Sequence, residues 1–153
     1  MTKRILLCDD EAHILRAAEF IFKRGGYDVV CAMDGQQGWE RICEQMPDIV
    51  VTDCQMPRLS GLGLAEKIRQ TPATAHLPII MLSAKGFELS SQQLQSQYGI
   101  RCLIGKPFSP RELFARVEAV LQSEEAAAMV FDGDGRRGNE LTARRDQLTA
   151  KMR

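Results

Sequence analysis

Acidic side chains stand at two points where a short apolar run of the sequence ends. Asp9 and Asp10 follow the run Arg4–Cys8, and Asp53 follows the run Asp48–Thr52. Carboxylates about 4 Å apart would repel each other by roughly 4 kcal/mol at an effective dielectric of about 20, so such a cluster needs a positive partner. Mg²⁺ prefers a few carboxylates together with water molecules that phosphate oxygens can later replace. The three acids therefore predict a magnesium site.

A serine and a lysine follow two further apolar runs. Ser83 comes directly after Leu77–Leu82, and Lys106 lies shortly after Ile100–Ile104. Ligands of open parallel α/β sheets bind at the carboxyl ends of the strands, so we expect both side chains to lie near the acids. The lysine would supply a second positive charge there.

The chemistry that fits this set is phosphoryl transfer to a carboxylate. Asp53 would attack a phosphoryl donor in line and form an acyl phosphate, while Mg²⁺ and Lys106 neutralise charge on the phosphoryl oxygens. Asp10 and Asp53 would hold the metal together with a backbone carbonyl near Gln55, and Asp9 would orient metal-bound water. The serine after the fourth run would donate a hydrogen bond to the phosphoryl group.

Each of these residues has an ordinary explanation when it is taken alone. Acids at a helix start favour the positive end of the helix dipole, which would account for Asp9-Asp10-Glu11. Asp53 could belong to a plain turn, and Lys106 could be a solvated surface lysine. Their joint placement at the ends of separate runs is what favours a common site.

Short β-branched runs alternate with longer amphipathic stretches, which is the sequence form of repeated βα units around a parallel sheet. Five strands are expected, at Arg4–Cys8, Tyr27–Ala32, Asp48–Thr52, Leu77–Leu82 and Ile100–Ile104. The expected helices end before Gly25, run from an Asp34 cap to Pro47, cover Leu62–Gln70 and Gly86–Tyr98, and run from a Ser109 cap to about Gln122.

The composition limits the class of protein. The chain has 153 residues, a formal net charge of zero and 44% apolar residues, which suits one compact domain without broad attraction to nucleic acid or anionic lipid. Its apolar runs are too short to cross a bilayer, and its five scattered cysteines suggest neither a disulfide framework nor a zinc site. We expect a cytoplasmic protein that binds neither nucleic acid nor membrane, with a domain over residues 1–122 and a flexible or partner-dependent tail over 123–153.

From about Lys3 to Gln122 the chain resembles the receiver family, the chemotaxis-type phosphoacceptor domains of two-component signalling. The similar parts are the family's first strand with its acidic pair, the strand before its phosphoacceptor, the DxxMPxxxG signature, the switch Ser/Thr with a small neighbour, and Lys-Pro-Phe with a cis peptide before proline. In this chain they are Ile5–Glu11, Asp48–Asp53, residues 53–61, Leu82–Ala84 and Lys106–Phe108.

The resemblance implies an α/β fold with a doubly wound five-stranded parallel sheet, flanked by five helices and flavodoxin-like in its strand order 2-1-3-4-5. It also implies a signalling protein with Mg²⁺-assisted self-phosphorylation and self-dephosphorylation on Asp53. A sensor histidine kinase or a histidine phosphotransfer protein would be the donor, and small donors such as acetyl phosphate could also serve. The surface of the fourth helix, fifth strand and fifth helix would bind a downstream protein target, and a homodimer is compatible with it.

Two features of the resemblance leave alternatives open. Leu103 stands where the family usually has the aromatic residue of its switch, so the inward rotation of a ring is not assumed, and Gln55 and Lys85 occupy positions that tune hydrolysis. The alternative function is a phosphorylation-independent pseudo-receiver, a constitutive protein-binding module. A flavin-binding protein is disfavoured because Asp9-Asp10-Glu11 would repel its phosphate, and a haloacid-dehalogenase-type phosphatase would need DxD after the first strand.

Overall fold

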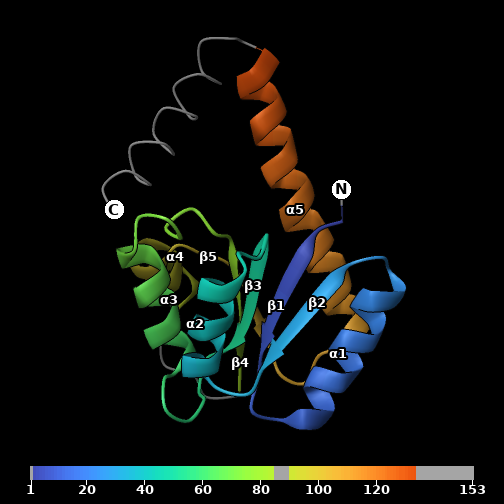
Figure 1. The fold of residues 1–153 in the computed structure, drawn as a ribbon, viewed down its shortest axis with the longest axis vertical. Helices are drawn as coiled ribbons and strands as arrows, with labels where there is room; N and C mark the ends of the chain where they lie inside the picture. The colour runs from blue at the N-terminus through green and yellow to red at the C-terminus, as the bar shows by residue number, and fades with distance from the viewer. Residues whose placement is uncertain (1, 85–89, 134–153) are drawn as a thin grey trace.

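A computed structural model describes residues 2–84 and 90–133, which form one parallel sheet with helices on both faces (Figure 1). The strand order is β2-β1-β3-β4-β5, so the predicted fold class and strand order are confirmed. The strands are β1 (Arg4–Cys8), β2 (Asp28–Ala32), β3 (Ile49–Asp53), β4 (Ile79–Ser83) and β5 (Ile100–Gly105). The helices are α1 (Ala12–Arg24), α2 (Gly35–Glu44), α3 (Gly61–Gln70), α4 (Ser91–Tyr98) and α5 (Pro110–Gly133).

Apolar side chains fill both faces of the sheet because successive strand residues point to opposite sides. In β1, Ile5 and Leu7 join one buried cluster, while Leu6 joins the other. Helices α1 and α5 cover the first face, and α2, α3 and α4 cover the second (Figure 1). The central strands β3 and β4 are therefore buried along their whole length, whereas the edge strands β2 and β5 also contain the exposed Asp28 and Arg101.

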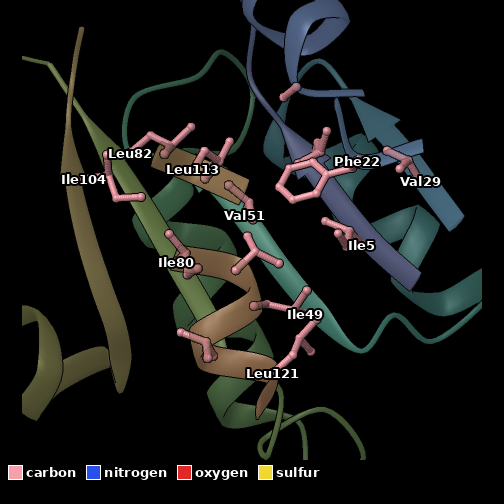
Figure 2. Packing of buried hydrophobic residues seen from close by; sticks show 14 of the residues in the cluster. Ile5, Phe22, Val29, Ile49, Val51, Ile80, Leu82, Ile104, Leu113 and Leu121 are labelled. Carbon is pink, nitrogen blue, oxygen red and sulfur yellow. The ribbon is translucent and has the colours of Figure 1, made fainter. Parts of the chain in front are cut away.

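Figure 2 shows how the first cluster is packed. Phe22 of α1 and Leu113 and Leu121 of α5 lie against strand residues such as Val51 and Ile80. Phe22 is also stacked on Phe114, with ring centroids 5.5 Å apart. This packing fixes α1 and α5 next to each other on the sheet, so the loops that precede them come together at one edge.

The strand register places the predicted site at the carboxyl edge of the sheet. Cys8 pairs with Thr52, Asp53 pairs with Leu82, and Ser83 pairs with Gly105. Asp9 follows Cys8, and Lys106 follows Gly105. Both residues therefore leave the sheet at the same edge as Asp53 and Ser83.

Helix α4 is shorter than expected. Ser90 has an extended backbone and caps the helix, since its hydroxyl accepts a hydrogen bond from the Gln93 amide and the Gln93 side chain accepts one from the Ser90 amide. Gly99 ends the helix in the left-handed conformation, with φ 63°. The prediction of one helix from Gly86 to Tyr98 is therefore wrong at its start, because a residue in the extended cap conformation interrupts it; Gly86 itself lies outside the described residues.

Helix α5 continues past the predicted end near Gln122, through Ser123 to Gly133. Glutamates and alanines, which are strong helix formers, follow Gln122 and extend the helix. Glu124 pairs with Arg101, which also hydrogen-bonds Ser123, and Glu125 lies 3.6 Å from the Lys3 ammonium. The segment Glu124–Ala128, whose helix formers allow such an extension, is therefore part of α5, while the domain boundary at residue 122 stays a prediction. Within the described ranges, no helix is both long and apolar enough to cross a membrane.

One arginine of α3 connects two loops at the opposite edge of the sheet. The Arg69 guanidinium donates hydrogen bonds to the backbone carbonyls of Tyr98 and Gly99 at 2.8 and 2.9 Å, and to those of Ala75 and Leu77 at 2.8 and 2.6 Å. Burial lowers the pKa of the guanidinium, and the charge of Arg101 adds to this effect. Arg69 thus stabilises the ends of α3 and α4 and the start of β4 together.

Candidate functional site

Three carboxylates meet at the carboxyl edge of the sheet. Asp9 and Asp10 follow β1, Asp53 ends β3, and one oxygen of each lies within 4.8 Å of the others. Asp9 and Asp53 are buried, with 1% and 7% of their surface exposed, whereas Asp10 is exposed. Asp9 Oδ1 accepts a hydrogen bond from the Glu11 amide at 2.9 Å, which fixes the orientation of this carboxylate.

Lys106 is the cation of this cluster. Its Nζ lies 2.7 Å from Glu11 Oε2, 2.9 Å from Asp9 Oδ2 and 3.3 Å from Asp53 Oδ2. The amide of the lysine donates a hydrogen bond to the Ser83 carbonyl at 2.8 Å, which places it at this edge. The peptide between Lys106 and Pro107 is cis, as the resemblance implied. Three negative side chains therefore share one ammonium group.

One buried carboxylate oxygen of this cluster, Asp9 Oδ2, lacks a hydrogen-bond donor within the described part of the chain. Lys106 is close enough to form an ion pair with it, but this oxygen has no hydrogen-bond partner among the described residues. The ammonium of Lys106 therefore compensates the charge of Asp9 without donating a directed hydrogen bond to this oxygen. A buried carboxylate oxygen that lacks a donor favours binding of a cation.

The charges in the site perturb one another. Burial raises the pKa of the Asp53 carboxyl, and the nearby charge of Asp9 raises it further, against the opposing effect of Lys106. Burial acts to lower the pKa of the Lys106 ammonium, but its bonds to Glu11 and Asp9 outweigh burial and raise it. The hydrogen bond from Lys106 lowers the pKa of Glu11. Lys106 is therefore charged at neutral pH, and the ionised form of Asp53 is less favoured than in water.

The site opens into a cavity of about 740 Å³ between α1 and the loops after β3 and β5. Its polar side includes Asp53, Lys106 and the exposed Asp10 and Gln55. Its lining also includes the apolar residues Ile14, Ala17, Ala18, Pro107, Phe108 and Pro110. A ligand at Asp53 would thus meet both charged and apolar groups.

The loop after β3 requires a glycine at its end. A Cβ atom on Gly61 would lie 1.8 Å from the Asp53 carbonyl oxygen, so the loop can close over the strand end only with glycine there. The Gly61 amide donates to the Cys54 carbonyl at 2.9 Å, and Ser60 caps α3 through the Gly63 amide at 3.0 Å. This is the structural reason for the glycine in the segment 53–61.

Most of the predicted site residues come together. Asp9, Asp10, Asp53 and Lys106 form one cluster, and Gln55 lines the same cavity. Ser83 is buried at the end of β4, but it is not among the residues that line the cavity. Lys85 lies outside the described residues. The individual roles assigned to these side chains stay predictions.

Sequence reasoning assigned no role to Glu11, although its carboxylate makes the shortest contact with Lys106. Glu11 is the residue directly after the acidic pair and the N-cap of α1, where it makes no side-chain capping bond. The available signal was only its position next to Asp10, because nothing in the sequence shows which way the side chain turns.

The residues fit a magnesium ion. Three carboxylates offer oxygens within 4.8 Å of one another, one buried oxygen lacks a donor, and the exposed Asp10 leaves access for water. Hard oxygen ligands with room for several waters are what Mg²⁺ prefers. The site is thus suited to Mg²⁺ in the way that the sequence predicted.

Comparison with known proteins agrees with the geometry. The family description "Response regulator receiver domain" matches residues 5–118. The chain is similar to the alkaline phosphatase synthesis transcriptional regulatory protein PhoP of Bacillus subtilis, with 38% identity over 128 residues, which are 84% of this chain and 52% of that protein. It spans about half the length of the curated relatives that it matches.

Solved structures give the same result. A CheY-like response regulator receiver domain protein from Methanospirillum hungatei has a TM-score of 0.72 and 27% identity, over 83% of this chain and 99% of that one. A response regulator receiver domain protein from Clostridium thermocellum has a TM-score of 0.71 and 27% identity, over 82% and 98%. Together with the acidic edge of a 2-1-3-4-5 sheet, these matches show that the chain belongs to the response regulator receiver domain family.

Proposed function

We propose that Asp53 accepts a phosphoryl group from a phosphohistidine of a sensor kinase or histidine phosphotransfer protein. The observation that carries the proposal is the position of Asp53, which borders an open cavity and lies 3.3 Å from the Lys106 ammonium, beside two further carboxylates. A carboxylate beside a fixed cation, with further acids that can hold Mg²⁺, is suited to accept a phosphoryl group.

The proposed reaction is an in-line displacement. An Asp53 carboxylate oxygen attacks phosphorus, the bond from phosphorus to the histidine nitrogen breaks, and the imidazole leaves with the electron pair and takes up a proton. Lys106 balances the charge of the transferred oxygens, and the Glu11 amide holds the Asp9 carboxylate in place. Mg²⁺, held by Asp10 and Asp53 with a carbonyl near Gln55 and with Asp9 behind them, would supply charge neutralisation at the phosphoryl oxygens.

The output is proposed to pass through the surface of α4, β5 and α5. Phosphorylation adds about 1.5 to 2 negative charges near Ser83, which ends the strand next to β5. Leu103 of β5 is partly buried against the second apolar cluster. A structural change at Ser83 would therefore reach this surface by repacking of the Leu103 side chain. Because a relative is named a transcriptional regulatory protein, we infer that the downstream partner acts in transcription; direct contact of these residues with nucleic acid is not proposed.

The test is intact-mass measurement after incubation with Mg²⁺ and acetyl phosphate. One phosphoryl adduct is expected, and it should be absent for Asp53→Asn and when the metal is chelated. If no adduct forms with acetyl phosphate or with a panel of phosphorylated kinases, and Mg²⁺ does not bind, the chain is a receiver fold that binds its partner constitutively.

A further inference from the structure

We propose that Glu11 is a positioning residue that restrains Lys106 and thereby slows phosphorylation of Asp53. The inference rests on the proposed function of Asp53. It goes beyond that function because it assigns a restraining role to a side chain outside the predicted metal and phosphoryl site.

The first argument is the order of the contacts. Lys106 Nζ is closest to Glu11, at 2.7 Å, and farthest from Asp53, at 3.3 Å. The contact with Glu11 is also a hydrogen bond, whereas the contact with Asp53 is only an ion pair. The lysine that should bind the phosphoryl group thus makes its shortest contact, and a hydrogen bond, with another carboxylate.

The second argument is the number of donors. An ammonium group has three N–H bonds, and Lys106 faces three carboxylates in this structure. Phosphoryl oxygens that approach the lysine compete with these three partners. Asp9 is buried with 2% of its side chain exposed, whereas Glu11 is 47% exposed and can turn into solvent. Glu11 is also the partner with the hydrogen bond to Lys106, so it is the contact that the phosphoryl oxygens must displace.

The third argument is charge. Glu11 places a negative group beside the same nitrogen that faces Asp53, so it also repels an incoming anionic donor. An exposed ion pair is weak and is screened by salt, so this restraint slows the reaction and does not block it. Loss of the contact should raise the rate of phosphorylation about two- to fivefold.

The experiment measures the rate of phosphoryl adduct formation by intact mass, with acetyl phosphate at saturating Mg²⁺. Glu11→Gln should raise the rate about two- to fivefold. The matched control is Glu40→Gln, which removes an exposed carboxylate from α2 and should leave the rate unchanged. Glu11→Asp keeps the charge but shortens the side chain, so it should also raise the rate. A Glu11→Asp variant with the wild-type rate, or a Glu11→Gln variant that is unchanged or slower, overturns the proposal.

A second readout follows the contact itself and does not depend on phosphorylation. The NMR signals of the Lys106 side-chain methylene next to Nζ are compared in an Asp53→Asn background, with and without Glu11→Gln, in the absence of donor. The signals should shift when Glu11 is replaced and stay in place for Glu40→Gln. If neither the wild type nor the Glu11 variants form an adduct, the proposed function fails. If Glu11→Gln does not shift the Lys106 signals, the inference about Glu11 is overturned, whatever the outcome for adduct formation.

Discussion

Replacement of Lys106 by methionine tests whether this lysine holds the acidic edge together. The side chain is 14% exposed and lies 2.9 Å from Asp9 and 3.3 Å from Asp53, whose side chains are 2% and 10% exposed. Removal of one partner from a buried ion pair costs roughly 3–5 kcal/mol, because a buried charge is left without compensation. The exposed pair with Glu11 adds little to this cost.

A second estimate from the structure leads to a similar value. Lys106→Met removes the attraction between the ammonium and Asp53 Oδ2, which lie 3.3 Å apart. Two opposite unit charges at that distance attract by roughly 5 kcal/mol at an effective dielectric of about 20, and part of this is offset because the methionine has no charge to desolvate. We therefore expect the free energy of unfolding to fall by about 3 kcal/mol at neutral pH with the metal chelated.

The assay is urea unfolding followed by the fluorescence of Trp39, the one tryptophan of the chain. Saturating Mg²⁺ should stabilise Lys106→Met more than the wild type, because the cation replaces the missing charge and binds the folded state. Lys23→Met is the control, since Lys23 is 59% exposed and lies 3.7 Å from Glu19; it should change stability by less than about 0.5 kcal/mol. A loss below about 1 kcal/mol for Lys106→Met without metal would refute the reasoning, since the acids would then not depend on the lysine.

Three further predictions concern other parts of the molecule. Asp53→Asn should stabilise the metal-free protein by about 1 kcal/mol at neutral pH, because the amide is not repelled by Asp9. Burial and Asp9 raise the pKa of Asp53 in the folded state, so the free energy of unfolding of the wild type falls as pH rises from the ordinary carboxyl pKa through the raised one. In urea unfolding, the stability gained by Asp53→Asn should therefore vanish at acid pH. Gly61→Ala should cost about 1–3 kcal/mol and slow adduct formation, because its Cβ would meet the Asp53 carbonyl, whereas Gly105→Ala, with open space around its Cβ, should be nearly neutral in the same unfolding and mass assays. Arg69→Met should lose about 3 kcal/mol in urea unfolding, because four backbone carbonyls lose their donor, and hydrogen exchange near Gly99 should become faster.

The sequence by itself determined the order of elements and the edge at which the site forms. Apolar runs such as Ile49–Val51 are short, β-branched and buried on both faces, so they form strands of a parallel sheet in almost any arrangement of the helices. Acids and a lysine that follow such runs must then come to one edge. This is why Asp9, Asp53 and Lys106 could be found without coordinates.

The tertiary structure decided which of these groups touch. The three contacts of Lys106 depend on strand register, on the hydrogen bond of its amide to Ser83 and on the turn of the Glu11 side chain, and none of these is a local property of the sequence. The same holds for the length of α5 beyond Gln122. There, pairing of Arg101 with Glu124 joins positions that are far apart in the chain, and only folding brings them within reach.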